Sequence, residues 1–168
     1  MGDYLNIEKS GNIEYVNNRD IFLELEGLRF FEYVPLVGLV WQFIFVAKGI
    51  LGNVGYTGGV RYLVNLVGTQ DTLLKAFSNE SGMNDKRWSQ PFTPADHFGN
   101  LIKLKCPTPN LQMSYELVIG NLNESESRKI VDDVARQLSL AYNHQSEPRC
   151  FNYGTNTFPW NQYLQSVS

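Results

Sequence analysis

Residues 39–67, LVWQFIFVAKGILGNVGYTGGVRYLVNLV, consist of two apolar runs that flank a glycine-rich connector. The first run, residues 39–47, is built of aromatic and β-branched residues, which fit the pleated, buried surface of a sheet. In the second run, residues 60–67, apolar side chains alternate with Arg61 and Asn65, in keeping with the two-residue period of a strand. We therefore predict two strands with little solvent on either face, joined by the connector.

The first run also raises the alternative of a membrane span, because about 20 apolar residues cross a bilayer. Between residues 34 and 51 only Gln42 and Lys48 are strongly polar. However, Pro35 and Gly38 interrupt the run, and its aromatic residues lie in the middle rather than at the ends, where a bilayer interface would favour them. We therefore expect no membrane segment.

The connector, residues 49–59, is distinguished by its glycines. Glycine lets backbone N–H groups approach an anion closely, so one interpretation is a cradle for a phosphate or another ligand. The other interpretation is a mobile hairpin tip or a bulged strand pair. No P-loop or dinucleotide-binding glycine motif is present. From this connector we take three candidate ligand-binding residues, Gly52, Gly55 and Gly58.

Composition places the chain among ordered globular proteins. Its 168 residues suit one domain over positions 1–168, and 43% hydrophobic with 18% charged residues argues against disorder. The net charge of −3 lacks the basic excess of nucleic-acid-binding proteins. Two cysteines, Cys106 and Cys150, and no signal-peptide h-region favour a cytoplasmic protein with reduced thiols. Because ordered structure is expected almost from residue 1, a domain excised from a larger multidomain protein is one option.

The N-terminal quarter predicts short strands. Residues 4–8 and 13–16 alternate apolar and polar side chains around a turn, which indicates a hairpin. Residues 21–26 alternate too and are interpreted as a strand or one helical turn. Residues 28–34 predict another apolar strand, which ends at Pro35.

Beyond residue 67 the sequence predicts a turn, a short helix and a late hairpin. Thr69 is a candidate cap for the short helix, over residues 72–77. Residues 101–106 and 114–119 are expected to pair as antiparallel strands, joined by the proline-containing turn at 107–110.

A long helix is predicted over residues 124–142. Asn123 is a suitable N-cap, and Glu126, three residues later, is its reciprocal partner. The helix carries one apolar stripe that we expect to face the core: Ile130, Val131, Val134, Leu138 and Ala141. The expected fold class is therefore α+β, a mostly antiparallel twisted sheet of about six to eight strands with one long C-terminal helix packed on it.

The polar segment at 78–99 supplies the remaining candidate ligand-binding residues. Its cationic and aromatic side chains, Lys86, Arg87, Trp88 and His97, could stack a base and hold a phosphate, or form an aromatic lid on the core. Arg61 joins them, because a cation between apolar neighbours needs a partner or a pocket. If this segment meets the glycine connector, the two form one mixed pocket; alternatively they lie at different edges of the sheet.

Few residues support a hypothesis of catalysis. A small hydrolytic enzyme could use His97 with Asp96 or Cys106, but no known local signature surrounds them. The chain has only four cysteine and histidine residues, without the spacing of a zinc site, so we expect no metal ion and no cofactor.

The leading functional hypothesis is therefore a non-catalytic ligand- or partner-binding, sensing module of a larger intracellular protein, with a bacterial source left open. Its expected partners are other domains of the same polypeptide, a protein partner, or a small anionic or aromatic ligand; membrane and nucleic acid are not expected. The alternatives are the hydrolytic enzyme and a structural domain that self-associates through its aromatic C-terminal tail around residues 158–163.

Overall fold

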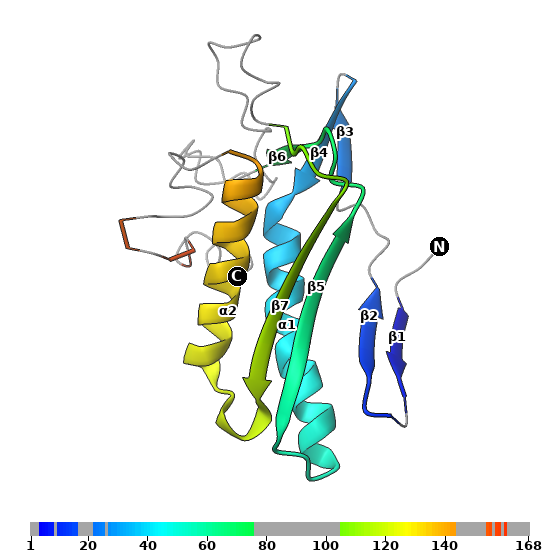
Figure 1. The fold of residues 1–168 in the computed structure, drawn as a ribbon, viewed down its shortest axis with the longest axis vertical. Helices are drawn as coiled ribbons and strands as arrows, with labels where there is room; N and C mark the ends of the chain where they lie inside the picture. The colour runs from blue at the N-terminus through cyan, green and yellow to red at the C-terminus, as the bar shows by residue number, and fades with distance from the viewer. Residues whose placement is uncertain are drawn as a thin grey trace, which may run out of the picture.

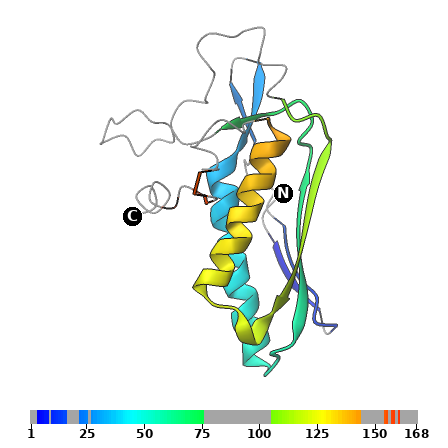
Figure 2. The same ribbon diagram turned by 60° about the vertical axis from the view of Figure 1, so that its left-hand side comes forward.

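The computed structural model of the chain describes residues 4–8, 10–16, 22–25, 27–75, 105–143, 154–155, 157–158 and 160. Two helices, α1 (Tyr33–Asn53) and α2 (Glu124–Ala141), lie side by side on one face of a long antiparallel strand pair (Figures 1 and 2). That pair consists of β5 (Gly59–Val67) and β7 (Asn110–Val118).

The remaining strands form two smaller sheets. An antiparallel hairpin of β1 (Tyr4–Ile7) and β2 (Ile13–Val16) lies on the β5 side of the strand pair (Figure 1). At one end of the helices, β4 (Leu28–Glu32) pairs antiparallel with β3 (Phe22–Leu25) and parallel with β6 (Leu73–Lys75).

The mixed class with antiparallel strand pairs is confirmed, but its finer arrangement differs from the expectation. In the described residues the strands form three separate small sheets rather than one sheet of six to eight strands. The same part of the chain contains two long helices where one long helix was expected. The difference follows mainly from α1, which takes chain that was assigned to the central sheet.

The prediction of a strand over residues 39–47 is wrong, because this run lies in the middle of α1. Apolar side chains occur on all sides of this helix, including the exposed Phe45 and Val46, so the helical period is masked. Trp41 Nε1 donates to Ser127 Oγ of α2 at 3.2 Å, whereas Val40 O accepts from the Tyr62 hydroxyl of β5 at 3.2 Å. On a third side, the Phe43 ring stacks with Tyr15 of β2 at 6.1 Å between ring centroids.

Pro35 does not end a strand, as was expected, but lies in the first turn of α1. The strand β4 ends at Glu32 and the helix begins at the next residue, Tyr33. A proline is tolerated in the first helical turn, because N–H groups there have no partner within the helix. The glycine connector is also altered, because Gly49 and Gly52 belong to α1 rather than to a link between strands.

Two further predictions near β6 and β7 are corrected. Residues 73–75 form β6 instead of the expected short helix, because Phe30 and Phe31 of β4 offer parallel backbone pairing to Leu73 and Leu74. Residues 114–118 of the strand expected at 114–119 belong to β7, which among the described residues pairs with β5, whereas pairing with residues 101–106 was expected. Ile119 begins the short 3₁₀ helix η2 (Ile119–Asn121). Residues 101–104 lie outside the described part of the chain.

Several local predictions are confirmed. The hairpin of β1 and β2 and the strand β5 lie where the alternation indicates them. The helix α2 begins after Asn123, whose side-chain Oδ1 accepts from Glu126 N at 3.0 Å. Of the predicted stripe, all but the half-buried Ala141 are buried: Ile130, Val131, Val134 and Leu138.

The core lies between the helices and the inner face of the β5–β7 pair. Alternate residues of β5 and one of β7 point into it: Tyr62, Val64, Leu66 and Met113. From the helices, Val37, Val134 and Leu138 have no solvent-exposed surface. The part Pro35–Asn53 of α1 is long and apolar enough to cross a membrane, but a core helix passes the same test, and a third of it is buried in the protein. Pro35 and Gly38 were expected to break the apolar run, but both lie within the continuous helix α1, so they do not argue against a membrane span.

Candidate functional site

A groove with a volume of about 800 Å³ lies between α1, β5 and the β1–β2 hairpin. We call it the β5 groove. Three stretches of chain supply most of its lining: residues 13–16 of β2, residues 60–67 of β5, and a row of apolar residues along α1. Its volume lies within the range of about 300–1,000 Å³ that small-ligand sites occupy, and its walls are mainly apolar, as such sites are.

The α1 wall is a row of apolar residues placed one helical turn apart. Leu39, Phe43, Ala47 and Leu51 are each half-buried and each line the groove. The Phe43 ring lies between Tyr15 of β2 and Tyr62 of β5, with centroid distances of 6.1 and 5.9 Å. This wall therefore offers apolar contact area along its length. We call the aromatic row of Tyr15, Phe43 and Tyr62 the groove floor.

The β5 wall presents a strand edge rather than a strand face. All eight residues from Val60 to Val67 line the groove, although neighbouring side chains of a strand point to opposite faces. A groove that touches consecutive residues must therefore run along the backbone edge of the strand. The other edge of β5 is the one that pairs with β7.

The ladder register identifies the backbone groups on the open edge. Beyond the two ends of the β5–β7 register, Gly68 N donates to Pro109 O at 2.8 Å and Ile119 N donates to Gly58 O at 3.0 Å. Because hydrogen-bonded pairs alternate along an antiparallel ladder, the even-numbered residues of β5 bond to β7. The odd-numbered residues therefore direct their N–H and C=O groups into the groove: Arg61, Leu63, Asn65 and Val67.

Two charged residues line the groove, Glu14 of β2 and Arg61 of β5. Arg61 Nε lies 2.9 Å from Glu116 Oε1 on β7, and both side chains are about 70% exposed, so this cross-strand pair is worth less than about 1 kcal/mol. Burial raises the pKa of Tyr62 well above its usual range, and its hydroxyl donates to Val40 O. The groove floor is therefore neutral at physiological pH.

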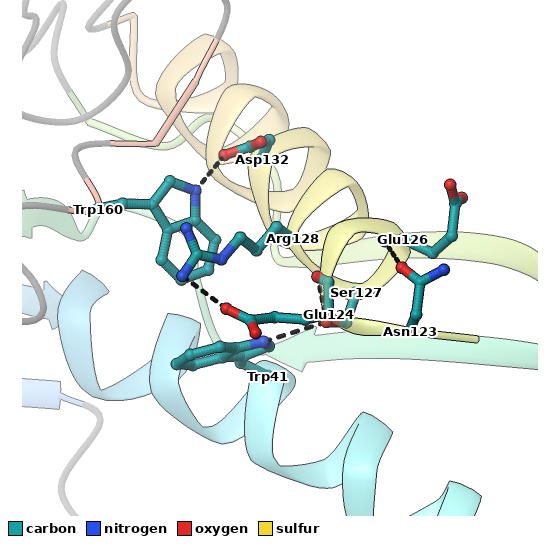
Figure 3. Close-up of polar contacts among 8 residues, drawn as sticks. All are labelled: Trp41, Asn123, Glu124, Glu126, Ser127, Arg128, Asp132 and Trp160. Atoms are coloured by element: carbon teal, nitrogen blue, oxygen red, sulfur yellow. Dashed lines mark hydrogen bonds and ion pairs between the residues drawn. The ribbon is translucent and has the colours of Figure 1, made fainter.

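A second cluster lies on the far side of α1 and joins both helices to the chain around residue 160 (Figure 3). The Arg128 guanidinium lies over two indole rings, 4.9 Å from the Trp160 centroid and 5.9 Å from that of Trp41. Its Nη2 donates to Glu124 Oε1 at 2.7 Å. We call these side chains, together with Asp132, the tryptophan clamp.

Asp132 anchors the later chain to this clamp. Its Oδ1 accepts from Phe158 N at 2.8 Å and from Trp160 Nε1 at 2.9 Å. Burial raises the pKa of Asp132, while the two hydrogen bonds and the positive charge of Arg128 oppose the rise. These contacts join Phe158 and Trp160 to α1 and α2, so the clamp is a tertiary anchor.

The structure brings one of the sequence-predicted binding residues, Arg61, to the groove. The three glycines lie near the far end of α1: Gly52 is helical, and Gly55 N donates to Gly52 O at 2.9 Å. A side chain at Gly58 would meet the Tyr56 ring, with its Cβ 2.8 Å from the hydroxyl oxygen. Ligand binding by these four residues stays a prediction. The other four candidates lie outside the described residues: Lys86, Arg87, Trp88 and His97.

The catalytic candidates are described only in part. Cys106 is a free thiol with no exposed surface, and its Sγ lies 3.6 Å from Thr108 O. Asp96, His97 and Cys150 lie outside the described residues. Among the residues that are described, no three histidine, cysteine or carboxylate side chains gather to hold a metal ion.

Of the groove lining, sequence reasoning identified Arg61 and missed the residues of β2, of α1 and of the rest of β5. A length signal was available, because the apolar stretch of residues 34–51 is longer than the roughly four to eight residues of a typical strand. The spacing of Leu39, Phe43, Ala47 and Leu51 is also that of one helix face. Comparisons with models of protein families, with curated proteins and with solved structures found no match to this chain.

Proposed function

We propose that the protein is a non-catalytic binding module of a larger intracellular protein, and that the β5 groove is its ligand site. The single observation that carries the proposal is the groove itself, which combines an apolar wall on α1 with a row of backbone polar groups on β5. Apolar area supplies affinity, and a few fixed polar groups supply orientation, which is the usual division in ligand sites.

The partner in this proposal is another domain of the same polypeptide or a separate protein. The mainly apolar lining, the pairing of Arg61 with Glu116 and the Glu14 side chain in the lining favour an apolar ligand surface over the small anionic ligand expected from the sequence. The packing of α1 against α2 and β5 supports its role as a core helix rather than a membrane span.

The probe that tests the groove is the uncharged, apolar fluorescent dye Nile red. We expect saturable binding with a stoichiometry near one on the folded protein. Ala47→Trp places a bulky ring in the groove and should abolish this binding. Gln42→Trp, exposed on the same helix and away from the groove lining, is the matched control and should leave it unchanged. Equal dye binding by both variants, or none by the wild type, would overturn the proposed site.

A further inference from the structure

The strand β5 is nine residues long, and one of its two edges is open. The backbone N–H and C=O groups on this edge have no pairing partner in the described chain. Arg61, Leu63, Asn65 and Val67 each offer one N–H and one C=O on this side, and β7 is the only described strand that pairs with β5. Such an edge is a template for another strand, and natural proteins usually protect it with lysine, proline or a bulge. This edge contains no proline or lysine, and its single charge, Arg61, is paired with Glu116.

The spacing of the α1 wall matches that of an added strand. Alternate side chains of a strand repeat every 6.4–6.8 Å or so. A step of four helical residues rises about 6 Å, which is the step from Leu39 to Phe43, Ala47 and Leu51. α1 and β5 have a similar direction in Figure 2 and cross obliquely in Figure 1, and the row and residues 60–67 of β5 line the same groove. A strand on the β5 edge would therefore set alternate side chains against successive residues of the row.

Building on the proposed function, we infer that the ligand of the β5 groove is an extended polypeptide segment that pairs with β5 as an additional strand. Main-chain hydrogen bonds to the odd-numbered residues of β5 fix its register, and the α1 row selects its side chains. The segment has apolar residues at every second position and no proline where it pairs.

Amide hydrogen exchange by NMR tests the pairing directly. The probe is a linear 12-residue peptide, selected on the wild-type protein from a random phage-displayed library and then synthesised. In the free protein, the amides of Tyr62, Val64 and Leu66 should exchange slowly because β7 already bonds them. The peptide should slow exchange at the odd-numbered amides of β5 by at least about tenfold, since each would gain a hydrogen bond.

A matched pair of proline variants separates edge pairing from general destabilisation. Leu63 and Ser114 lie directly opposite each other in the ladder register, and both side chains are exposed. By the same alternation, each directs its N–H away from the partner strand, on opposite edges of the pair. Leu63→Pro should weaken peptide binding by at least about tenfold, whereas Ser114→Pro should leave it within about twofold.

The outcomes distinguish this inference from the proposed function. Slowed exchange at the odd-numbered amides with selective loss in Leu63→Pro supports strand pairing. Peptides that bind equally to both proline variants, or that leave those amides unprotected, overturn strand pairing while a groove ligand stands. If the dye binds but the library yields no binding peptide, strand pairing is likewise overturned and the groove remains a ligand site. Absence of groove-dependent dye binding overturns the proposed function itself. If Leu63→Pro does not fold, the exchange experiment on the wild type still decides.

Discussion

The helices α1 and α2 lie in the same layer but depend on different kinds of sequence. α2 has a side-chain cap at Asn123 and ion pairs along its exposed surface, Glu124 with Arg128 and Glu126 with Lys129. Its buried residues form a single stripe. α1 has no acidic residue in its first turn and only one charged residue, Lys48, whose Nζ donates to Leu122 O.

Helical stability therefore has two different sources in this fold. α2 contains enough local signal to mark its own start and its buried side. α1 continues directly from β4 and gains its stability from contacts with α2, β5 and β2. Its sequence therefore lacks a clear helical repeat of apolar and polar residues. The same multiple contacts leave one of its sides as the wall of the β5 groove. The predictions below test how far this contrast holds.

The largest effect is expected from a charge placed in the shared core. Val134→Asp in α2 and Val37→Asp in α1 should each unfold the protein, because both side chains are fully buried and an unpaired buried charge costs several kcal/mol. Circular dichroism melting is the measurement. Val46→Asp, on the exposed side of α1, should melt near the wild-type temperature. A folded Val37→Asp with wild-type melting would show that α1 does not depend on the core.

Removing the tryptophan clamp should have the next largest effect. Trp160→Ala removes ring contacts with Trp41 and Phe158, the contact with Arg128 and the hydrogen bond to Asp132. We expect a loss of roughly 2–3 kcal/mol in the free energy of unfolding, measured by urea denaturation. Trp160→Phe, which keeps a ring but not the N–H, should lose less than half of that. Equal losses would mean that the hydrogen bond dominates.

A smaller loss of stability is expected from removing the side-chain cap that α2 has at Asn123. Asn123→Ala should cost about 1 kcal/mol in the free energy of unfolding, because it leaves the Glu126 N–H without its capping partner. Ser125→Ala, also exposed at the start of α2, is the control and should change stability by less than about 0.5 kcal/mol. If both variants behave alike, the cap does not distinguish α2 from α1.

The smallest effects should appear as opposite pH trends at two neighbouring carboxylates of α2. Burial raises the pKa of Asp132. Burial also acts to raise the pKa of Asp133, but hydrogen bonds from Arg136, Gln137 and Tyr115 outweigh it and hold that pKa below its usual range. The ionised form is therefore disfavoured by folding at Asp132 and favoured by folding at Asp133.

These signs fix the expected melting curves. Asp133→Asn should lower Tm above about pH 5. This deficit should shrink as the pH falls through the ordinary aspartate range near 4, and vanish only below the lowered pKa of folded Asp133, where the wild-type carboxyl is protonated in both the folded and the unfolded state. Asp132→Asn should match the wild type at low pH and gain relative Tm as the pH rises, because the amide never pays the burial cost of a charge. Melting from pH 2.5 to 6.5 checks both. Parallel trends for the two variants would contradict the assigned environments.

The elements that the sequence predicted well are those with local signals. The alternation of β1, β2 and β5 and the cap and stripe of α2 each lie within one short stretch of chain. The failure at α1 has a physical cause: aromatic and β-branched residues suit a strand, but contacts on several sides stabilise them in a helix. Trp41 and Phe45, four residues apart with ring centroids at 6.0 Å, show the helical neighbours that residue types alone did not reveal.

The candidate site was less predictable than the fold. The β5 groove combines β2, α1 and β5, which are separate in sequence, and it exists only because the first apolar run is a helix. Arg61 was identified from the pattern, although its partner Glu116 lies 55 positions away and was not. Which edge of β5 is open depends on which strand pairs with it. The sequence of a single strand does not show which distant segment it pairs with.

The pairing of β5 with β7 has a consequence for how the chain folds as it is made. Val67 and Asn110 are opposite in register, yet roughly forty residues separate them, which a ribosome adds in several seconds at about 5–20 residues per second. During that interval α1 has already emerged and can cover Tyr62, Val64 and Leu66, but both edges of β5 are open. The nascent chain therefore passes through a stage in which β5 can pair on either side, and strand exchange with another nascent chain competes with the arrival of β7.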